Sequence, residues 1–128
     1  MSLDKAINDV VEFHKEFGLP VRTVPQIPLE TERALRYDLL DEEMDELGKA
    51  WAEDDLVEIT DALTDIIYVA IGMALSYGIP LAEVWNEVHL SNMEKLGGGL
   101  REDGKILKPK GWVPPRVKEI LLVHGYTD

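Results

Sequence analysis

Acidic side chains recur at helical spacing in two neighbouring stretches of the chain. Between positions 37 and 65 the sequence holds twelve acidic residues and one basic residue, Lys49. Apolar residues in the first stretch recur mostly every three or four positions, which predicts a helix over residues 31–53 with an apolar stripe of Leu35, Leu39, Leu40, Met44, Leu47 and Trp51. Asp55 followed by Glu58 fits a capping box, so a second helix is expected to begin near Leu56.

The phase of Glu43 separates it from most of its acidic neighbours. Glu43 follows Leu39 by four residues and precedes Leu47 by four, so it lies within the apolar stripe of the first helix. Glu46 lies one turn further along, and Glu42 borders the stripe. The pattern therefore predicts carboxylates that face the interior of the fold.

The second helix repeats this arrangement. Asp61 and Asp65 are four residues apart on one face, and Glu58 lies one turn before Asp61. No residue from 66 to 75 is charged, so Asp65 is expected at the mouth of a buried segment. The turn at residues 53–55 is short, which predicts antiparallel neighbours whose carboxylates face each other.

Several carboxylates brought together inside a fold require a counter-charge. Burying anions is costly, and like charges one turn apart repel each other. Mg²⁺ or Mn²⁺ is the natural ion, because oxygen ligands suit these hard cations. Metal-activated water could then carry out hydrolysis, with Glu42 or Glu46 accepting a proton. The alternative is an acidic hairpin whose glutamates extend to solvent; the repeated pattern favours the metal site.

The remaining elements predict an all-α fold. We expect helices over residues 3–17, 31–53 and 56–77, a fourth after Pro80, and a short last helix over 116–124. They would form an antiparallel bundle of about four main helices in a single domain, residues 1–128. Helices three and four carry apolar residues on more than one side, which predicts that the bundle dimerises.

Composition limits the classes of function. The chain has no cysteine, so disulfides and thiolate metal sites are excluded. The net charge of −12 argues against binding a nucleic acid polymer. The longest uncharged stretch, residues 66–82, is short and is interrupted by glycine and proline, so no membrane span is expected. A cytoplasmic protein is the expectation.

A cation-rich segment follows the fourth helix. Asn92 continues the apolar stripe of that helix, and Lys95 lies about one turn further. The following loop adds Arg101, Lys105, Lys108 and Lys110, with Trp112 and a Pro-Pro pair after them. A solvated charged loop is one interpretation. The functional one is a phosphate clamp, held by Trp112, that folds over an anionic ligand at the acidic site.

These residues together resemble the all-alpha nucleoside triphosphate pyrophosphatase superfamily of MazG-like and phosphoribosyl-ATP pyrophosphatase-like proteins. The resemblance rests on Glu42-Glu43-x-x-Glu46, on Glu58-x-x-Asp61 with Asp65, and on the segments DALTDIIYVAIGMALSYGI, EVHLSNMEKL and DGKILKPKGWVPP. The later segments resemble the Cof-like or phosphoribosyl-ATP pyrophosphohydrolase-like branch. The resemblance spans roughly residues 35–122.

The resemblance implies a homodimer or a dimer of dimers that hydrolyses nucleoside triphosphates, often non-standard or deoxy ones, to monophosphate and pyrophosphate with Mg²⁺. It implies metal ligands at Glu43, Glu46, Asp61 and Asp65, with Glu42 and Glu58 assisting. Asn92, Lys95, Lys108 and Lys110, together with Lys105 and Trp112, would bind the substrate. One position departs from the pattern: Ala62 stands where the superfamily carries a glutamate, so Glu58 or Asp61 would supply that carboxylate.

Two competing functions remain. The first is a non-catalytic acidic helical module that binds a nucleotide or a protein partner without turnover. The second, ranked lower, is hydrolysis of phosphoribosyl-ATP.

Overall fold

The computed structural model describes residues 3–127; the remaining residues of the predicted domain, 1–2 and 128, lie outside the described residues. Its five helices are α1 (Leu3–Glu16), α2 (Glu30–Ala52), α3 (Leu56–Tyr77), α4 (Leu81–Met93) and α5 (Val117–Val123). The described residues form no β-strand, only an isolated bridge between Leu100 and Ile106. The all-α prediction, with four main helices and a short last one, is confirmed.

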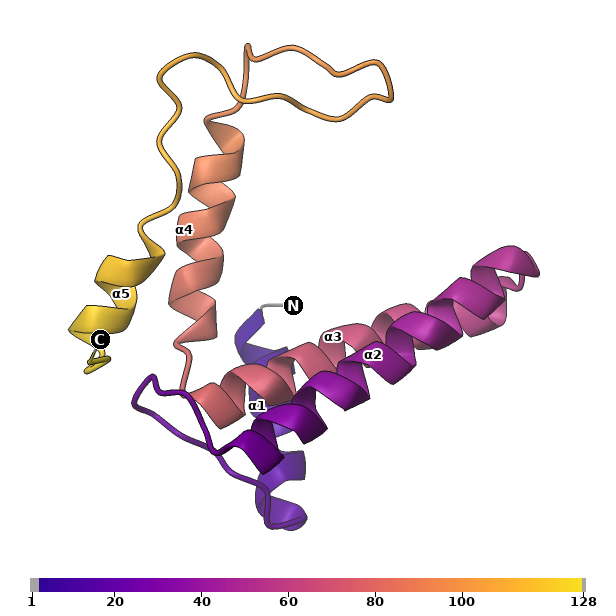
Figure 1. The fold of residues 1–128 in the computed structure, drawn as a ribbon, viewed down its shortest axis with the longest axis vertical. Coiled ribbons are helices and arrows are strands. Elements are labelled where there is room, and N and C mark those ends of the chain that lie inside the picture. The colour runs from indigo at the N-terminus through magenta and orange to yellow at the C-terminus, as the bar shows by residue number, and fades with distance from the viewer. Residues whose placement is uncertain (1–2, 128) are drawn as a thin grey trace.

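Helices α2 and α3 form a long antiparallel hairpin (Figure 1). The side chain of Asp55 accepts a hydrogen bond from the Glu58 backbone N–H, which confirms the predicted N-cap. Gly78 ends α3 in the left-handed conformation, with φ at 69°. A side chain at Gly78 would also collide with the Val24 carbonyl, so only glycine fits at this crossing.

Helix α1 packs across the end of the hairpin that lies away from the tight turn (Figure 1). Val10, Ile71 and Leu75 form the buried cluster there, and partly buried residues such as Ile7 surround it. The connection over residues 17–29 runs along the end of α3, where Arg22 N–H donates to Leu75 O and Gln26 N–H to Tyr77 O. These bonds satisfy carbonyl groups that the end of a helix leaves free.

Polar side chains are buried next to this cluster. His14 is 1% exposed and Arg36 is 5% exposed, and the two approach each other over Gly72. A Cβ at Gly72 would lie 3.0 Å from His14 Nε2 and 3.2 Å from Arg36 Nη1. Glycine at this position therefore leaves space for the side chains of both His14 and Arg36.

The apolar stripe predicted for α2 only partly matches its buried face. Leu39, Leu40 and Leu47 are half-buried, but Met44 and Trp51 are exposed. The face toward α3 instead includes Arg36 and Ala50. A short residue and a cationic residue thus occupy buried positions of α2 that the pattern of large apolar residues does not predict.

Helix α4 leaves the base of the hairpin at a wide angle, and α5 returns beside α4 (Figure 1). The segment between them forms a loop at the free end of α4. Large apolar side chains consequently stay exposed in one chain, among them Trp51, Leu56, Trp85 and Leu90.

Helix α3 is the one described helix that is long and apolar enough to cross a membrane, with a mean hydropathy of 1.5 in its most apolar window. This is weak support for a span, because the core helix of a soluble protein has the same properties. Here α3 packs against α2 and α1.

Candidate metal centre

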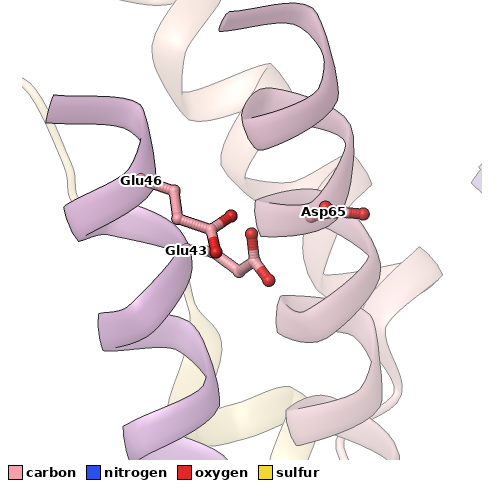
Figure 2. A group of neighbouring side chains, drawn as sticks. All are labelled: Glu43, Glu46 and Asp65. Atoms are coloured by element: carbon pink, nitrogen blue, oxygen red, sulfur yellow. The ribbon is translucent and has the colours of Figure 1, made fainter. Parts of the chain in front are cut away.

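Three carboxylates from the two arms of the hairpin meet at its inner face. Glu43 and Glu46 come from α2 and Asp65 from α3, and one oxygen of each lies within 4.8 Å of the others (Figure 2). Glu43 and Asp65 are half-buried, whereas Glu46 is exposed. The cluster can therefore be reached from solvent through its Glu46 side.

The local electrostatics disfavour three full negative charges. Burial raises the pKa of Glu43 above its ordinary value, and the charges of Glu46 and Asp65 raise it further. Burial also raises the pKa of Asp65, with the charges of Asp61 and Glu46 adding to it. A bound cation would reverse these effects by stabilising the charged forms.

The donor set fits a hard divalent ion. All three donors are carboxylate oxygens, the ligands that Mg²⁺ and Mn²⁺ prefer. Glu43 Oε2 is buried and has no hydrogen-bond partner among the described residues. An unsatisfied buried acceptor beside two other carboxylates is the arrangement that a shared cation would complete.

The other predicted carboxylates are not part of this cluster. Glu42, Glu58 and Asp61 are exposed. Asp61 is close enough for its charge to raise the pKa of both Glu43 and Asp65, whereas Glu58 has no such effect on either. Ala62 is 2% exposed. Of the two residues proposed to replace the missing glutamate, Asp61 therefore lies closer to the cluster.

The predicted substrate-binding residues lie on the other arm of the molecule. Asn92 and Lys95 are among the residues that line a hollow of about 370 Å³ at the end of α4, together with Leu100 and Ile106. Lys105, Lys108 and Lys110 are exposed in the loop that follows. In a single chain this loop stands at the free end of α4, away from the hairpin (Figure 1). The chain does not fold its own lysines over its own carboxylates.

Trp112 has a structural role within this loop. Its Nε1–H donates a hydrogen bond of 2.8 Å to Ser91 O on α4. Lys95 Nζ lies 5.3 Å from the centroid of its ring, and Lys108 Nζ lies 4.8 Å from it. The indole thus joins the loop to α4 and gathers two ammonium groups by cation–π attraction. The substrate contact of Trp112 stays a prediction; its Nε1–H is already bonded to Ser91 O.

Sequence reasoning did not select Arg36. It precedes Glu43 by seven residues, and this spacing placed it on the same helical face. Its guanidinium is buried, and its Nε has no hydrogen-bond partner among the described residues. Burial lowers the pKa of Arg36, while Glu32 acts in the opposite direction. The signal for Arg36 in the sequence is its helical phase, seven residues before Glu43.

A known protein family matches most of the chain. Residues 10–92 match the family described as phosphoribosyl-ATP pyrophosphohydrolase. The chain belongs to this family. This membership agrees with the resemblance to the MazG-like superfamily. The matched residues include all three clustered carboxylates.

A viral protein is also similar to the chain. It is "Uncharacterized protein L479" of Acanthamoeba polyphaga mimivirus, 44% identical over 84 residues, which is 61% of this chain and 34% of that protein. The chain matches about a third of the length of this relative.

Proposed function

We propose that the protein hydrolyses a nucleoside or deoxynucleoside triphosphate to the monophosphate and pyrophosphate with Mg²⁺ or Mn²⁺, in the cleaning of nucleotide pools. The observation that carries this proposal is the group of Glu43, Glu46 and Asp65, with its unsatisfied buried oxygen, in a pyrophosphohydrolase family member. Phosphoryl transfer depends mainly on charge neutralisation and positioning.

The residues would divide the work as follows. Glu43, Glu46 and Asp65 would hold the ion, with Asp61 beside them. The bound ion would neutralise phosphate charge and lower the pKa of a coordinated water. Glu42 or Glu46, which are both exposed, would accept the proton of the attacking water. The new bond joins the water oxygen to phosphorus. The anhydride bond between the α- and β-phosphoryl groups breaks, and its electron pair leaves on the departing oxygen.

A second copy of the chain would supply the cations. Residues 37–65 carry a net charge of −11 (one lysine against twelve acidic residues), while five of the thirteen basic residues lie in residues 95–110. The two regions lie on different arms of one chain (Figure 1). In a homodimer or a dimer of dimers, the loop of one copy can meet the hairpin of the other, where its lysines would offset charge on pyrophosphate. Trp51, Leu56 and Val57, each more than 70% exposed, would then be buried.

The association is tested by analytical ultracentrifugation. The expected result is a dimer or tetramer at micromolar concentration. A monomer that still turns over substrate would contradict it. We also expect a soluble cytoplasmic protein, which cell fractionation checks.

The reaction is tested with a panel of ribo- and deoxynucleoside triphosphates, assayed separately for pyrophosphate and for single phosphate. Glu43→Gln is compared with Asp38→Asn, which removes an exposed carboxylate from the same helix. Pyrophosphate release that Glu43→Gln abolishes and Asp38→Asn retains is the expected result. Metal-dependent nucleotide binding with no release of either product would instead identify a non-catalytic binding module.

The family match favours phosphoribosyl-ATP as a second candidate substrate. Growth of a histidine auxotroph that lacks this hydrolase tests it, because only phosphoribosyl-ATP hydrolysis restores growth. We rank it below nucleoside triphosphates, the substrates that the resemblance to the superfamily implies.

A further inference from the structure

An apolar hollow of about 270 Å³ lies near the tight turn of the hairpin. Its lining consists of Met44, Leu47, Gly48 and Trp51 from α2 and Ile59 from α3. None of these five residues is charged, although the hairpin as a whole is strongly acidic. Met44 and Trp51 are exposed, so one chain leaves two large apolar side chains of this lining in water. Exposed apolar patches of this kind mark interaction surfaces.

Gly48 leaves open space in the wall of this hollow. A Cβ at Gly48 would meet no atom within 4 Å, so no close contact within the described chain requires glycine there. The residue lies inside α2 and has an ordinary helical backbone, where glycine is less stable than alanine. Gly72 differs, because His14 and Arg36 pack directly over it. The space above Gly48 is therefore available to a side chain of another molecule.

The loop after α4 presents apolar side chains to solvent. Leu96 is 92% exposed, and Leu100 and Ile106 are also exposed. The loop is held in shape by the bridge between Leu100 and Ile106 and by a hydrogen bond from Leu107 N–H to Gly99 O. Leu96 is thus an aliphatic side chain with almost no cover in its own chain.

Charge identifies the molecule that carries the matching side chain. Leu96 directly follows Lys95, and residues 95–110 hold five basic residues, whereas residues 37–65 carry a net charge of −11. Surfaces of opposite charge attract and orient each other. The loop and the hairpin of one chain lie on separate arms (Figure 1). The loop that meets the hairpin therefore belongs to a second copy of the chain.

We propose that Leu96 of one copy inserts into the hollow over Gly48 of a second copy, and that the second copy returns the same contact. Such a two-fold arrangement closes the dimer and gives it two identical contacts. Each contact covers Trp51 and carries Lys95 onto the acidic hairpin of the other copy. The inference rests on the association in the proposed function and names the residues that produce it.

The first test is the dissociation constant of the dimer, measured by analytical ultracentrifugation without nucleotide or metal. Leu96→Ala removes the inserted side chain. Gly48→Leu fills the hollow from within, because Met44 and Trp51 lie one turn to either side of position 48. Each variant removes both contacts, so we expect about tenfold weaker association for each contact and about a hundredfold for the dimer.

The two variants should restore association when they are mixed. In the mixed dimer, Leu96 of the Gly48→Leu chain meets the open hollow of the Leu96→Ala chain, so one of the two contacts is intact. The mixed dimer should therefore be about tenfold tighter than either variant alone. Fluorescence anisotropy of one labelled variant, titrated with the other, measures this recovery.

Loss of fold does not imitate this pattern. Leu96 is too exposed to stabilise its own chain, and leucine is a better helix former than the glycine it replaces at position 48. Circular dichroism should therefore show unchanged helix content in both variants. Val123→Ala removes an 82% exposed apolar side chain from α5 and should leave the dissociation constant unchanged.

Three results would overturn the inference: a monomeric wild type, a mixture no tighter than its components, or weakening by Gly48→Leu alone. The last result would mean that the hollow meets the hairpin of the other copy. Triphosphate turnover by a wild-type dimer that neither variant weakens would keep the proposed reaction and overturn this contact. Restored association on mixing, without turnover of any triphosphate by the wild type, would support the contact and contradict the reaction.

Discussion

Glu43 on α2 and Asp65 on α3 approach each other across the hairpin, and the charge of Asp65 raises the pKa of Glu43. The two residues come from different helices of the hairpin. The packing of these helices therefore holds the two charges close together despite their repulsion. That opposition has measurable consequences for the stability of the protein.

The metal-free protein should become less stable as the pH rises toward neutrality. The folded state holds the protons of Glu43 and Asp65 more tightly than the unfolded chain, because both pKa values are raised above their ordinary values of 4.5 and 3.8. The contribution of the two groups to the stability of the fold is therefore fully present below their ordinary pKa values. It is lost as the pH rises through their raised pKa values. Urea unfolding in a chelator across this range measures it. In Glu43→Gln the stability should depend less on pH. An unchanged pH dependence would contradict the role assigned to Glu43.

Divalent ions should reverse this loss. An ion that binds only the folded state at a hundred times its dissociation constant adds about 2.7 kcal/mol to the free energy of unfolding. We expect Mg²⁺ or Mn²⁺ to raise the melting temperature of the wild type and of Asp38→Asn. Asp65→Asn removes one of the three clustered ligands, so its shift should be much smaller. Equal shifts in all three proteins would place the ion elsewhere.

Two glycines in helices should respond in opposite ways to alanine. Gly72→Ala places a Cβ 3.0 Å from His14 Nε2, and the resulting displacement should cost about 1–3 kcal/mol of stability. Gly48→Ala meets no atom within 4 Å and should add up to about 1 kcal/mol through helix propensity. Chemical denaturation of both variants makes the comparison. A neutral Gly72→Ala would mean that His14 and Arg36 can move apart freely.

Trp112 should control the order of the cationic loop. Trp112→Leu removes both the bond to Ser91 O and the ring beneath Lys95 and Lys108. Trp112→Phe removes the bond and keeps a ring. We expect trypsin to cut after Arg101 or Lys105 fastest in the leucine variant and at an intermediate rate in the phenylalanine variant, with helix content unchanged by circular dichroism. Identical cleavage rates in all three would show that the loop does not depend on Trp112.

Local signals in the sequence predict the hairpin well. The Asp55 cap, the helix end at residue 77 and the short turn each depend on residues a few positions apart, and all three occur in the structure. The inward phase of Glu43 has the same local origin. A helical period of 3.6 residues is enough to place it, whatever the rest of the chain does.

The relations that the sequence could not predict are non-local. The approach of His14 to Arg36 over Gly72 joins three helices. The direction of α4, which separates the lysines from the carboxylates, depends on packing at the base of the hairpin (Figure 1). The exposure of Met44 and Trp51 was also not predictable from local sequence. An apolar row on a helix does not indicate whether it is covered by the same chain or by another chain.

The hairpin is joined at both ends. Near its base Arg22 pairs with Glu32 and donates to Ser76 O, and at the opposite end Asp55 N–H donates to Ala50 O across the tight turn. The carboxylates therefore lie between two fixed ends of the hairpin. All three donors are carboxylate oxygens, which suit both Mg²⁺ and Mn²⁺, so the type of ligand would not discriminate between the two ions. In a cell, the abundance of each metal would then decide which one the site carries.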